Sequence, residues 1–412
     1  MEYGLIGEHL SHSFSKLIHE SLESYKYDLK ELSPLELESF LLKRDFKAVN
    51  VTIPYNQDVI PYLDYLDEAA KEIGAVNIIV NRNGKLCGYN SDVDGFIYLL
   101  DRAGISVKDK TVLILGTGGA SKAIKYALNK LGVKKILMAS RTKCPRYLSY
   151  SEIKNHPEIE VVVNATPIGM YPHNEFGFDI FDDLRNLEGY VDAIYNPINT
   201  KNVVDVSLRG VKAIGGMYML IYQAIRSIEI FLDKKIGDDV VDVIYKKIMK
   251  EHSNIVLIGM PTSGKSKIGY LLARELGVEF VDTDKVVEDQ IDMSVAEYFE
   301  KYGEASFREL ETKVIESIYK DTPKVISTGG GVIKNIENIK MLKQNGKIIF
   351  IDRPLEKLFA SSDRPLASNL EDLTKLYEKR LPIYRKYADY VIQNDKDDVL
   401  DVVKEILSLW KY

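Results

Sequence analysis

Two glycine-rich segments constrain the fold of this chain more than any other feature. Each lies between a short apolar run and an amphipathic run: ILGTGGASKA at residues 114–123 and GMPTSGKS at residues 259–266. A strand that turns on glycines into a helix presents backbone N–H groups at a helix N-terminus, where nucleotide phosphates bind. The two turns differ in type, so the sequence predicts two nucleotide sites of different kinds.

The chain has 412 residues, more than one hydrophobic core usually organises. A prior of about 150 residues per domain predicts two or three domains. The formal net charge of -6 provides no broad basic field, which argues against nucleic-acid binding. No apolar run reaches transmembrane length and the N-terminus lacks a signal-peptide pattern, so we expect no membrane association and a cytoplasmic location.

Short apolar runs alternate with longer amphipathic segments, as in YGLIG, TVLILG, NIVLIG and KIIFID. Buried strands separated by helices predict an α/β fold with parallel sheets. A charged helical segment precedes the strand at residues 254–258, so the main domain boundary is expected near Glu251. The two cysteines, Cys87 and Cys144, lack metal-ligand spacing and are expected to be reduced thiols.

The second glycine turn has the spacing and context of a Walker A loop. It follows the apolar run NIVLIG and precedes the amphipathic KIGYLLAREL. In such a loop Lys265 reaches the transferred phosphoryl group and the Ser266 hydroxyl coordinates Mg²⁺. The loop therefore predicts a nucleoside triphosphate as donor, and it leaves the acceptor open.

The segments FVDTD, GEASFRELE, STGGG, DRPLA and KRLPIYR follow this loop in order. Asp284 after a strand can orient an alcohol or accept its proton. Arg308 and Arg380 suit a bidentate clamp on a small carboxylate. Together the segments resemble shikimate kinase over residues 254–411.

That resemblance implies roles for individual residues of the second half. Shikimate is held by Asp284, Arg308, Gly330, Gly331 and Arg380. ATP is held by Gly259, Ser263, Gly264, Lys265, Ser266 and Lys267, with Arg364 from a lid. Mg²⁺ lies at Ser266 and Asp282, and the catalytic residues are Asp284 and Lys265.

The first glycine turn, in TVLILGTGGASKAIKYAL, suits the pyrophosphate of a dinucleotide. The next predicted strand, KKILMA, ends in SRT and so lacks the acidic residue that binds a ribose 2′-hydroxyl. Arg141 in that position instead suits the 2′-phosphate of NADP. The segment between SRT and VVVNATP is short, so we expect a trimmed cofactor lobe.

Hydroxyl and amide residues occur at strand ends around this turn, and such groups bind a polyol without introducing charge. They lie in HSFSK, VNVTIP, AVN and GYNSD before the turn, and in NATPIGM, YNP and GGMYMLIYQA after it. This ordered set resembles shikimate dehydrogenase over residues 1–245, a two-lobed NADP enzyme. The resemblance implies a shikimate pocket of Ser13, Ser15, Thr52, Asn77, Asp92 and Gln223. It implies an NADP(H) site of Gly116, Gly118, Gly119, Ala120, Ser140, Arg141, Thr142, Tyr195 and Gly216.

The resemblances together divide the chain into three parts. Residues 1–97 form a substrate-binding lobe, completed by helices at about 218–248. Residues 98–217 form a Rossmann-like NADP lobe. Residues 252–412 form a P-loop kinase domain with a parallel sheet.

One position departs from the dehydrogenase pattern. The family has a lysine two residues after NVTIP, and NVTIPYNQ places Asn56 there. That lysine, paired with the residue at Asp92, passes the proton during hydride transfer, and Asn56 takes its place among the catalytic positions. An amide can hydrogen-bond a carbonyl oxygen but cannot supply a proton. The adjacent Tyr55 is the other candidate donor.

The leading hypothesis is a fused enzyme with ATP, Mg²⁺ and NADP(H) as cofactors. NADPH would reduce 3-dehydroshikimate to shikimate, and ATP would phosphorylate the 3-hydroxyl. The alternative is an active shikimate kinase fused to a catalytically impaired dehydrogenase-like module that binds or regulates, and Asn56 favours it. In a third hypothesis the P-loop half phosphorylates another small alcohol.

Overall fold

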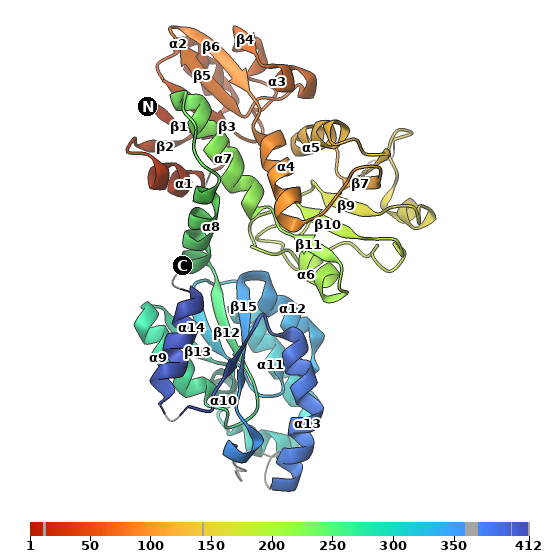
Figure 1. The fold of residues 1–412 in the computed structure, drawn as a ribbon, viewed down its shortest axis with the longest axis vertical. Helices are drawn as coiled ribbons and strands as arrows, with labels where there is room; N and C mark the ends of the chain where they lie inside the picture. Colours follow the sequence, from red (N-terminus) through yellow and green to blue (C-terminus); the bar gives the residue numbers. More distant parts are fainter. Residues whose placement is uncertain (11–13, 142–143, 359–369, 397, 411–412) are drawn as a thin grey trace. The chain divides into compact units, whose positions relative to one another are not determined.

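The computed structural model describes residues 1–10, 14–141, 144–358, 370–396 and 398–410 (Figure 1). The chain divides into two compact units, Met1–Tyr245 and Lys246–Tyr412. Among the helices within these described ranges, none has both the length and the apolar character needed to cross a bilayer.

The first lobe of the Met1–Tyr245 unit is a six-stranded sheet in the order β2-β1-β3-β5-β6-β4. Its strands are β1 (Tyr3–Gly7), β2 (Tyr27–Glu31), β3 (Ala48–Val51), β4 (Tyr65–Leu66), β5 (Ile78–Arg82) and β6 (Lys85–Tyr89). Its helices are α1 (Ser15–Leu22), α2 (Pro34–Lys43), η1 (Ile60–Tyr62) and α3 (Glu68–Ile73).

The sheet of this lobe is mixed, with one antiparallel strand among the parallel ones. Strand β5 runs antiparallel to both β3 and β6. The hairpin between β5 and β6 turns on Asn83 and Gly84, which have φ values of 54° and 85°. Asn-Gly with two positive φ angles is the preferred two-residue hairpin turn, and this signal was present in the sequence.

The second lobe is a parallel five-stranded sheet in the order β11-β10-β9-β7-β8. Its elements are β7 (Thr111–Leu115), α5 (Gly119–Lys130), β8 (Lys135–Ala139), η2 (Tyr150–Asn155), β9 (Val161–Asn164), β10 (Gly189–Asp192), α6 (Lys201–Leu208) and β11 (Lys212–Ile214). In the described part of the connection from β8 to β9, the short 3₁₀ helix η2 stands where the connection from β7 to β8 has an α-helix.

Strand β7 is apolar from Val112 to Leu115 because both of its faces are covered. Val112 and Ile114 face one hydrophobic core, whereas Leu113 and Leu115 face the other. A parallel strand covered on both faces has no solvent side on which to place polar residues.

Helices α4 (Asp92–Ala103) and α7 (Met217–Leu232) pack against each other and connect the two lobes (Figure 1). Their approach is close, because a Cβ at Gly95 would lie 2.7 Å from the carbonyl oxygen of Met219. Helix α8 (Asp239–His252) follows, and its Tyr245 ring stacks on Tyr218 of α7. The lobes are therefore joined by packed helices as well as by the chain itself.

The Lys246–Tyr412 unit contains a parallel five-stranded sheet in the order β13-β14-β12-β15-β16. Its strands are β12 (Asn254–Ile258), β13 (Glu279–Asp282), β14 (Lys324–Ser327), β15 (Gly346–Asp352) and β16 (Tyr390–Gln393). Its helices are α9 (Lys265–Leu276), α10 (Thr283–Ile291), α11 (Val295–Ile318), η3 (Val332–Lys334), α12 (Ile336–Asn345), η4 (Leu355–Lys357), α13 (Leu370–Tyr387) and α14 (Val399–Trp410).

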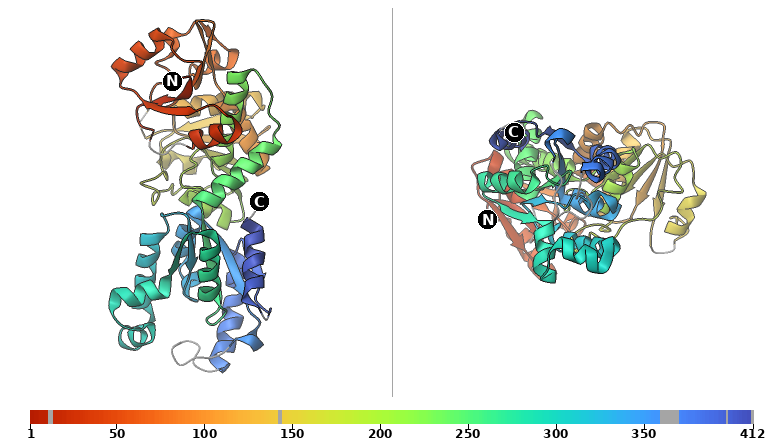
Figure 2. Two further views of the ribbon diagram at one scale, coloured as in Figure 1. Left: turned by 90° about the vertical axis from the view of Figure 1, so that its left-hand side faces the viewer. Right: turned by 90° about the horizontal axis from the view of Figure 1, so that it is seen from below.

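Helices cover both faces of this sheet (Figure 2). Helices α9 and α14 contribute to one core, and α10 to α13 contribute to the other. Along β12, Ile255 and Leu257 face the first core, whereas Val256 and Ile258 face the second. All the buried residues of both cores come from within residues 255–407.

We therefore expect residues 252–412 to fold without the rest of the chain, because their hydrophobic cores are internally complete. The purified fragment should unfold in a single cooperative transition when urea unfolding is followed by circular dichroism. A matched fragment that starts at residue 239 keeps helix α8 whole. If only the longer fragment unfolds cooperatively, helix α8 is part of the folding unit and the expected boundary is wrong.

Candidate active sites

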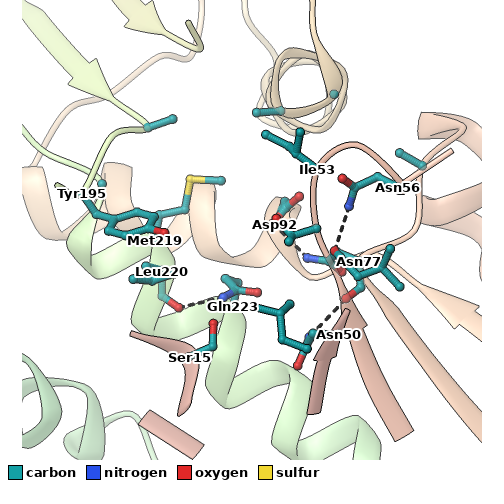
Figure 3. Close-up of a pocket in the computed structure, with 18 of the residues that line it drawn as sticks. Ser15, Asn50, Ile53, Asn56, Asn77, Asp92, Tyr195, Met219, Leu220 and Gln223 are labelled. Atoms are coloured by element: carbon teal, nitrogen blue, oxygen red, sulfur yellow. Dashed lines mark hydrogen bonds between the residues drawn. The ribbon is translucent and has the colours of Figure 1, made fainter. Parts of the chain in front are cut away.

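The first site is a pocket of about 510 Å³ in the Met1–Tyr245 unit. Its wall is formed by residues of β1 and β3 and of the segments after them, by the segments before β5 and after β10, and by the N-terminal parts of four helices, α1, α4, α5 and α7. Figure 3 shows these side chains around the pocket. Ligand pockets measure about 300–1,000 Å³, so this volume suits a small molecule. The polar side chains in the wall are His9, Ser15, Asn50, Thr52, Asn56, Asn77, Asp92, Tyr195 and Gln223.

The structure brings most of the expected shikimate residues together in this pocket. Those in the wall are Ser15, Thr52, Asn77, Asp92 and Gln223, and Ser13 lies outside the described residues. They come from five separate segments of the chain, so only the folded lobes unite them. Asn50 also lies in the wall, where it donates from Nδ2 to the Asn77 carbonyl at 3.1 Å and to Ser227 Oγ at 2.8 Å.

Asp92 is the ionisable carboxyl of the pocket. Asn77 donates from Nδ2 to Asp92 Oδ1 at 2.9 Å, and Asn77 Oδ1 accepts from the backbone N–H of Ser91 at 2.9 Å. Burial raises the pKa of Asp92 to about 6, and the hydrogen bond from Asn77 opposes that shift. The carboxyl therefore titrates close to neutral pH.

Asn56 is half-buried in the same wall. Its Nδ2 donates to the carbonyl oxygens of Val51 at 2.9 Å and Val76 at 3.1 Å. Two carbonyl partners fix the orientation of the amide, so Oδ1 is the atom left for the pocket. An amide oxygen accepts hydrogen bonds and cannot donate one, so the side chain has no donor left for the ketone oxygen of a ligand.

Tyr55 does not face the pocket. Its side chain is buried in the hydrophobic core of the first lobe, and its hydroxyl donates to the Leu32 carbonyl at 2.5 Å. The side chain is thus held away from the ligand by packing, and the idea that Tyr55 donates the proton is wrong.

The expected NADP residues surround the start of helix α5. Gly118 is the N-cap of this helix and has no side chain, and a Cβ at Gly118 or Gly119 would meet no atom within 4 Å. This open space at a helix N-terminus fits a pyrophosphate. Gly119, Ala120, Tyr195 and Gly216 line the pocket itself, and Gly116 turns the chain with a φ of 104°.

The residues expected near the ribose follow strand β8. Ser140 donates from its backbone N–H to the Leu148 carbonyl at 2.9 Å, and Arg141 is exposed. An exposed guanidinium after the second strand fits a 2′-phosphate. Thr142 lies outside the described residues.

The second site begins with the loop between β12 and α9. Gly264 has a φ of 92°, a conformation that side chains rarely adopt, and it is the N-cap of α9. Lys265 is buried and donates from Nζ to the carbonyl oxygens of Gly259 at 3.1 Å and Met260 at 2.9 Å. Ser263 is buried in the loop, and its carbonyl accepts from Asn394 Nδ2 at 2.7 Å. The loop therefore has the shape of a phosphate cradle around one lysine.

Two oxygen ligands adjoin this loop. Ser266 donates from Oγ to Asp282 Oδ2 at 2.5 Å, and Asp282 caps helix α10 through Asp284 N at 3.2 Å. Mg²⁺ in phosphoryl-transfer sites is held by few protein oxygens together with phosphates, so this pair fits the ion. Lys267 is exposed on the first turn of α9, and Arg364 lies outside the described residues.

The expected shikimate residues of the kinase meet at the loop Gly329–Gly331 after β14. Arg380 of α13 donates from Nη1 to the Gly330 carbonyl at 2.9 Å and is only 4% exposed. A Cβ at Gly331 would overlap the Arg308 guanidinium, and one at Gly329 would lie within 3.0 Å of Asp284 Oδ1. The absence of side chains on the loop thus lets two cations and a carboxylate approach one another.

Glu311 is the last residue of the segment GEASFRELE, and its side chain contacts Arg308. Its Oε2 accepts from Arg308 Nη1 at 2.9 Å, one turn earlier on α11. Arg308 also donates from Nη2 to Glu304 Oε1 at 3.1 Å. Burial raises the pKa of Glu311 to about 7, although Arg308 opposes the shift. The helical spacing of Arg308 and Glu311 was the available signal.

Comparison with protein families identifies both halves. The profile of the shikimate dehydrogenase substrate binding domain matches residues 5–79. The profile of shikimate kinase matches residues 261–411. The two matched segments lie in different structural units.

Individual relatives cover the first unit. The NADP(+) shikimate dehydrogenase of Clostridium beijerinckii is 37% identical over 265 residues, which are 59% of this chain and 96% of that protein. The shikimate dehydrogenase 1 structure from Peptoclostridium difficile is 36% identical with a TM-score of 0.56, covering 60% of this chain and 98% of that one. The Listeria monocytogenes shikimate 5-dehydrogenase, solved with shikimate and NAD, is 28% identical with a TM-score of 0.54, covering 59% and 96%.

These matches agree with the α/β architecture, the Rossmann-like lobe and the P-loop domain described above. The curated relatives of the first unit are named as NADP(+) enzymes, and the profile that matches the second unit is that of a kinase. The chain belongs to the shikimate dehydrogenase family through its first unit and carries a shikimate kinase domain in its second, which makes it a bifunctional protein of the shikimate pathway.

Proposed function

We propose that the Lys246–Tyr412 unit transfers the γ-phosphoryl group of ATP to the 3-hydroxyl of shikimate. The observation that carries this proposal is the contact between the two loops: a Cβ at Gly330 would lie 2.9 Å from Pro261 in the P-loop. The acceptor loop with its two arginines is therefore a direct neighbour of the phosphate cradle. Shikimate-dependent formation of ADP by the purified chain tests this activity.

The side chains of the unit have separate tasks in this proposal. Arg308 and Arg380 hold the substrate carboxylate, which orients the ring. Asp284 takes the proton of the attacking hydroxyl. Lys265 stabilises charge on the transferred group, with Ser266 and Asp282 holding Mg²⁺. ATP supplies the phosphoryl group.

We propose that the pocket of the first unit binds shikimate or 3-dehydroshikimate beside NADP(H) and interconverts them slowly. NADPH supplies the hydride when it is bound. The alkoxide then needs a proton, and the group at the lysine position, Asn56, offers only an oxygen atom. Burial raises the pKa of Asp92 to about 6, so its carboxyl is mainly ionised above that pH and is a poor proton donor there. Weak reduction is the expected result.

A second candidate function for this unit is binding without turnover. The Asn56 amide is bonded to two backbone carbonyls and leaves the rest of the polar wall in place. A pocket of this kind retains ligand affinity while losing the group that acts in the transition state. The unit would then bind shikimate or NADP(H) in a regulatory or structural role.

The domain limits are also proposed: 1–97 with 218–248 for the substrate lobe, 98–217 for the NADP lobe and 252–412 for the kinase. The arrangement of the three sheets supports them. We further propose a cytoplasmic location, which agrees with the unpaired Cys87 and Cys144.

Arg380→Ala should impair shikimate use while sparing ATP. Leaving one charge of a buried clamp unpaired costs about 2–5 kcal/mol, which corresponds to a large rise in the shikimate KM or to loss of turnover. Lys379→Ala, an exposed neighbour on the same helix, is the matched control and should change neither KM. Equal losses of ATP and shikimate affinity in Arg380→Ala would remove this residue from the acceptor site.

Arg141 should decide the choice between NADPH and NADH. A guanidinium gains a charge-assisted hydrogen bond only when the 2′-phosphate is present. The full chain should therefore bind NADPH more tightly in fluorescence titrations, and Arg141→Ala should narrow the gap. Arg146→Ala, a nearby exposed arginine, should leave the gap unchanged. Equal affinities in the unmodified chain would contradict the assignment.

Asn56→Lys should raise the kcat of shikimate-dependent NADP⁺ reduction by at least about tenfold with little change in the shikimate KM. Positioned acid–base catalysis contributes about 10²–10⁴-fold, and its effect is confined mainly to the transition state. The measurement is initial-rate absorbance of NADPH at saturating NADP⁺.

Asn56→Met is the matched control for this variant. Methionine also removes the two hydrogen bonds to the Val51 and Val76 carbonyls and also lengthens the side chain, but it carries no proton. An equal gain in both variants would show that release of the amide, and not the ammonium group, is responsible. Rapid turnover by the unmodified chain, unimproved by lysine, would mean that another group carries the proton.

A further inference from the structure

Glu311 is a buried carboxyl that the phosphoryl transfer described above does not use. Its side chain is 1% exposed, and its Oε1 has no hydrogen-bond partner among the described residues. A Cβ at Gly329 would lie within 3.0 Å of this oxygen and also of Asp284 Oδ1. The unpartnered oxygen therefore faces the loop at which the acceptor residues meet.

Burying an ionised carboxylate whose oxygen Oε1 has no hydrogen-bond donor within the described ranges costs free energy. A buried ionised carboxyl must be compensated by charges and hydrogen bonds on its oxygens, otherwise the neutral form is favoured. Only one oxygen of Glu311, Oε2, receives a bond from Arg308. Burial together with the nearby Asp284 raises the pKa of Glu311 to about 7, against the opposing effects of Arg308 and Arg380.

The charges that face Glu311 come from every helix packed around it. Helix α10 supplies Asp284, α11 supplies Arg308 and Glu304, and α13 supplies Arg380 and the neutral Tyr384. Lys334 of η3 pairs with Glu304 at 2.7 Å. With Glu311 protonated, three cationic groups face two carboxylates, and the cluster keeps one net positive charge for a carboxylate ligand. With Glu311 ionised that charge is cancelled.

We propose that the proton on Glu311 sets the affinity of this site for the acceptor, because it decides whether Arg308 is available to the substrate carboxylate. This inference rests on the proposed kinase function and concerns the regulation of the same site. Glu311 is a positioning residue, since it acts through Arg308. Above neutral pH the ionised side chain binds Arg308 as an internal competitor of the substrate.

The test is the pH dependence of the kinase reaction of the full chain. Shikimate-dependent ADP formation at saturating MgATP reports the kinase site alone, even though the first unit also binds shikimate. The shikimate KM should rise about fivefold to tenfold between pH 6 and pH 8, as expected for one group that titrates near pH 7. The kcat at saturating shikimate should change much less, because the competition is removed by excess substrate.

Glu311→Gln should abolish this rise. Glutamine keeps an oxygen for Arg308 and imitates the neutral carboxyl, but it does not titrate. Glu304→Gln is the matched control, since it removes the other carboxylate bound to Arg308. Glu304 is 31% exposed, and its pKa is lowered, not raised. This control should shift the KM at every pH and still show the rise.

A flat KM profile in the unmodified chain, with normal activity, would overturn this inference and leave the kinase function intact. A rise that persists in a folded Glu311→Gln protein would assign the titration to another group and overturn it as well. If Glu311→Gln does not fold, Glu311→Asp replaces it, because the shorter side chain withdraws the carboxyl from its buried position. The rise of the shikimate KM should then occur at a different pH, and a rise at the same pH would contradict the proposal. No shikimate-dependent ADP at any pH would instead refute the kinase function itself, and this inference with it.

Discussion

Both sites depend on one constraint, which is that a parallel strand covered on both faces can present polar groups only where it ends. Strands β7 and β12 divide their apolar side chains between two hydrophobic cores, where these side chains do not meet a ligand. The glycine turns that follow these two strands are the first places where backbone N–H groups become available. The donors of hydride and phosphate are therefore expected at those turns, and the acceptor residues are supplied by neighbouring loops and helices.

Each site contains one buried carboxyl, Asp92 in the first and Glu311 in the second, and different groups oppose the rise in its pKa. Burial raises the pKa of Asp92 to about 6, and a hydrogen bond from the neutral amide of Asn77 opposes this shift. Burial raises the pKa of Glu311 to about 7, although Arg308 and Arg380 oppose the shift. Among the described residues Asp92 thus lacks a cationic partner, because Asn56 stands where the family has a lysine. Glu311 instead has two arginines nearby, so its protonation changes the net charge of the cluster around it.

Asn56 shows how a single side chain can separate binding from turnover. Its amide nitrogen satisfies two backbone carbonyls, so the wall of the pocket remains closed and polar. The polarity of the remaining oxygen is wrong for a ketone that gains negative charge. Ligand binding depends on all the polar side chains of the pocket wall, whereas protonation of the product depends on one donor group. Asn56 removes that donor and leaves the other side chains of the wall in place.

The sequence by itself determined the two nucleotide turns, most of the strands and both family resemblances, because these depend on local spacing and on ordered motifs. The antiparallel direction of strand β5 was missed although Asn83 and Gly84 carry the hairpin signal, since an apolar run alone does not show strand direction. The direction of Tyr55 was decided by its bond to Leu32, 23 residues away. The orientation of the Asn56 amide depends on the carbonyls of Val51 and Val76, and the unpartnered oxygen of Glu311 depends on a loop that follows another strand. Residue patterns specify which groups are present, and only the packing of distant segments decides which atoms face each other and which charges lose their water.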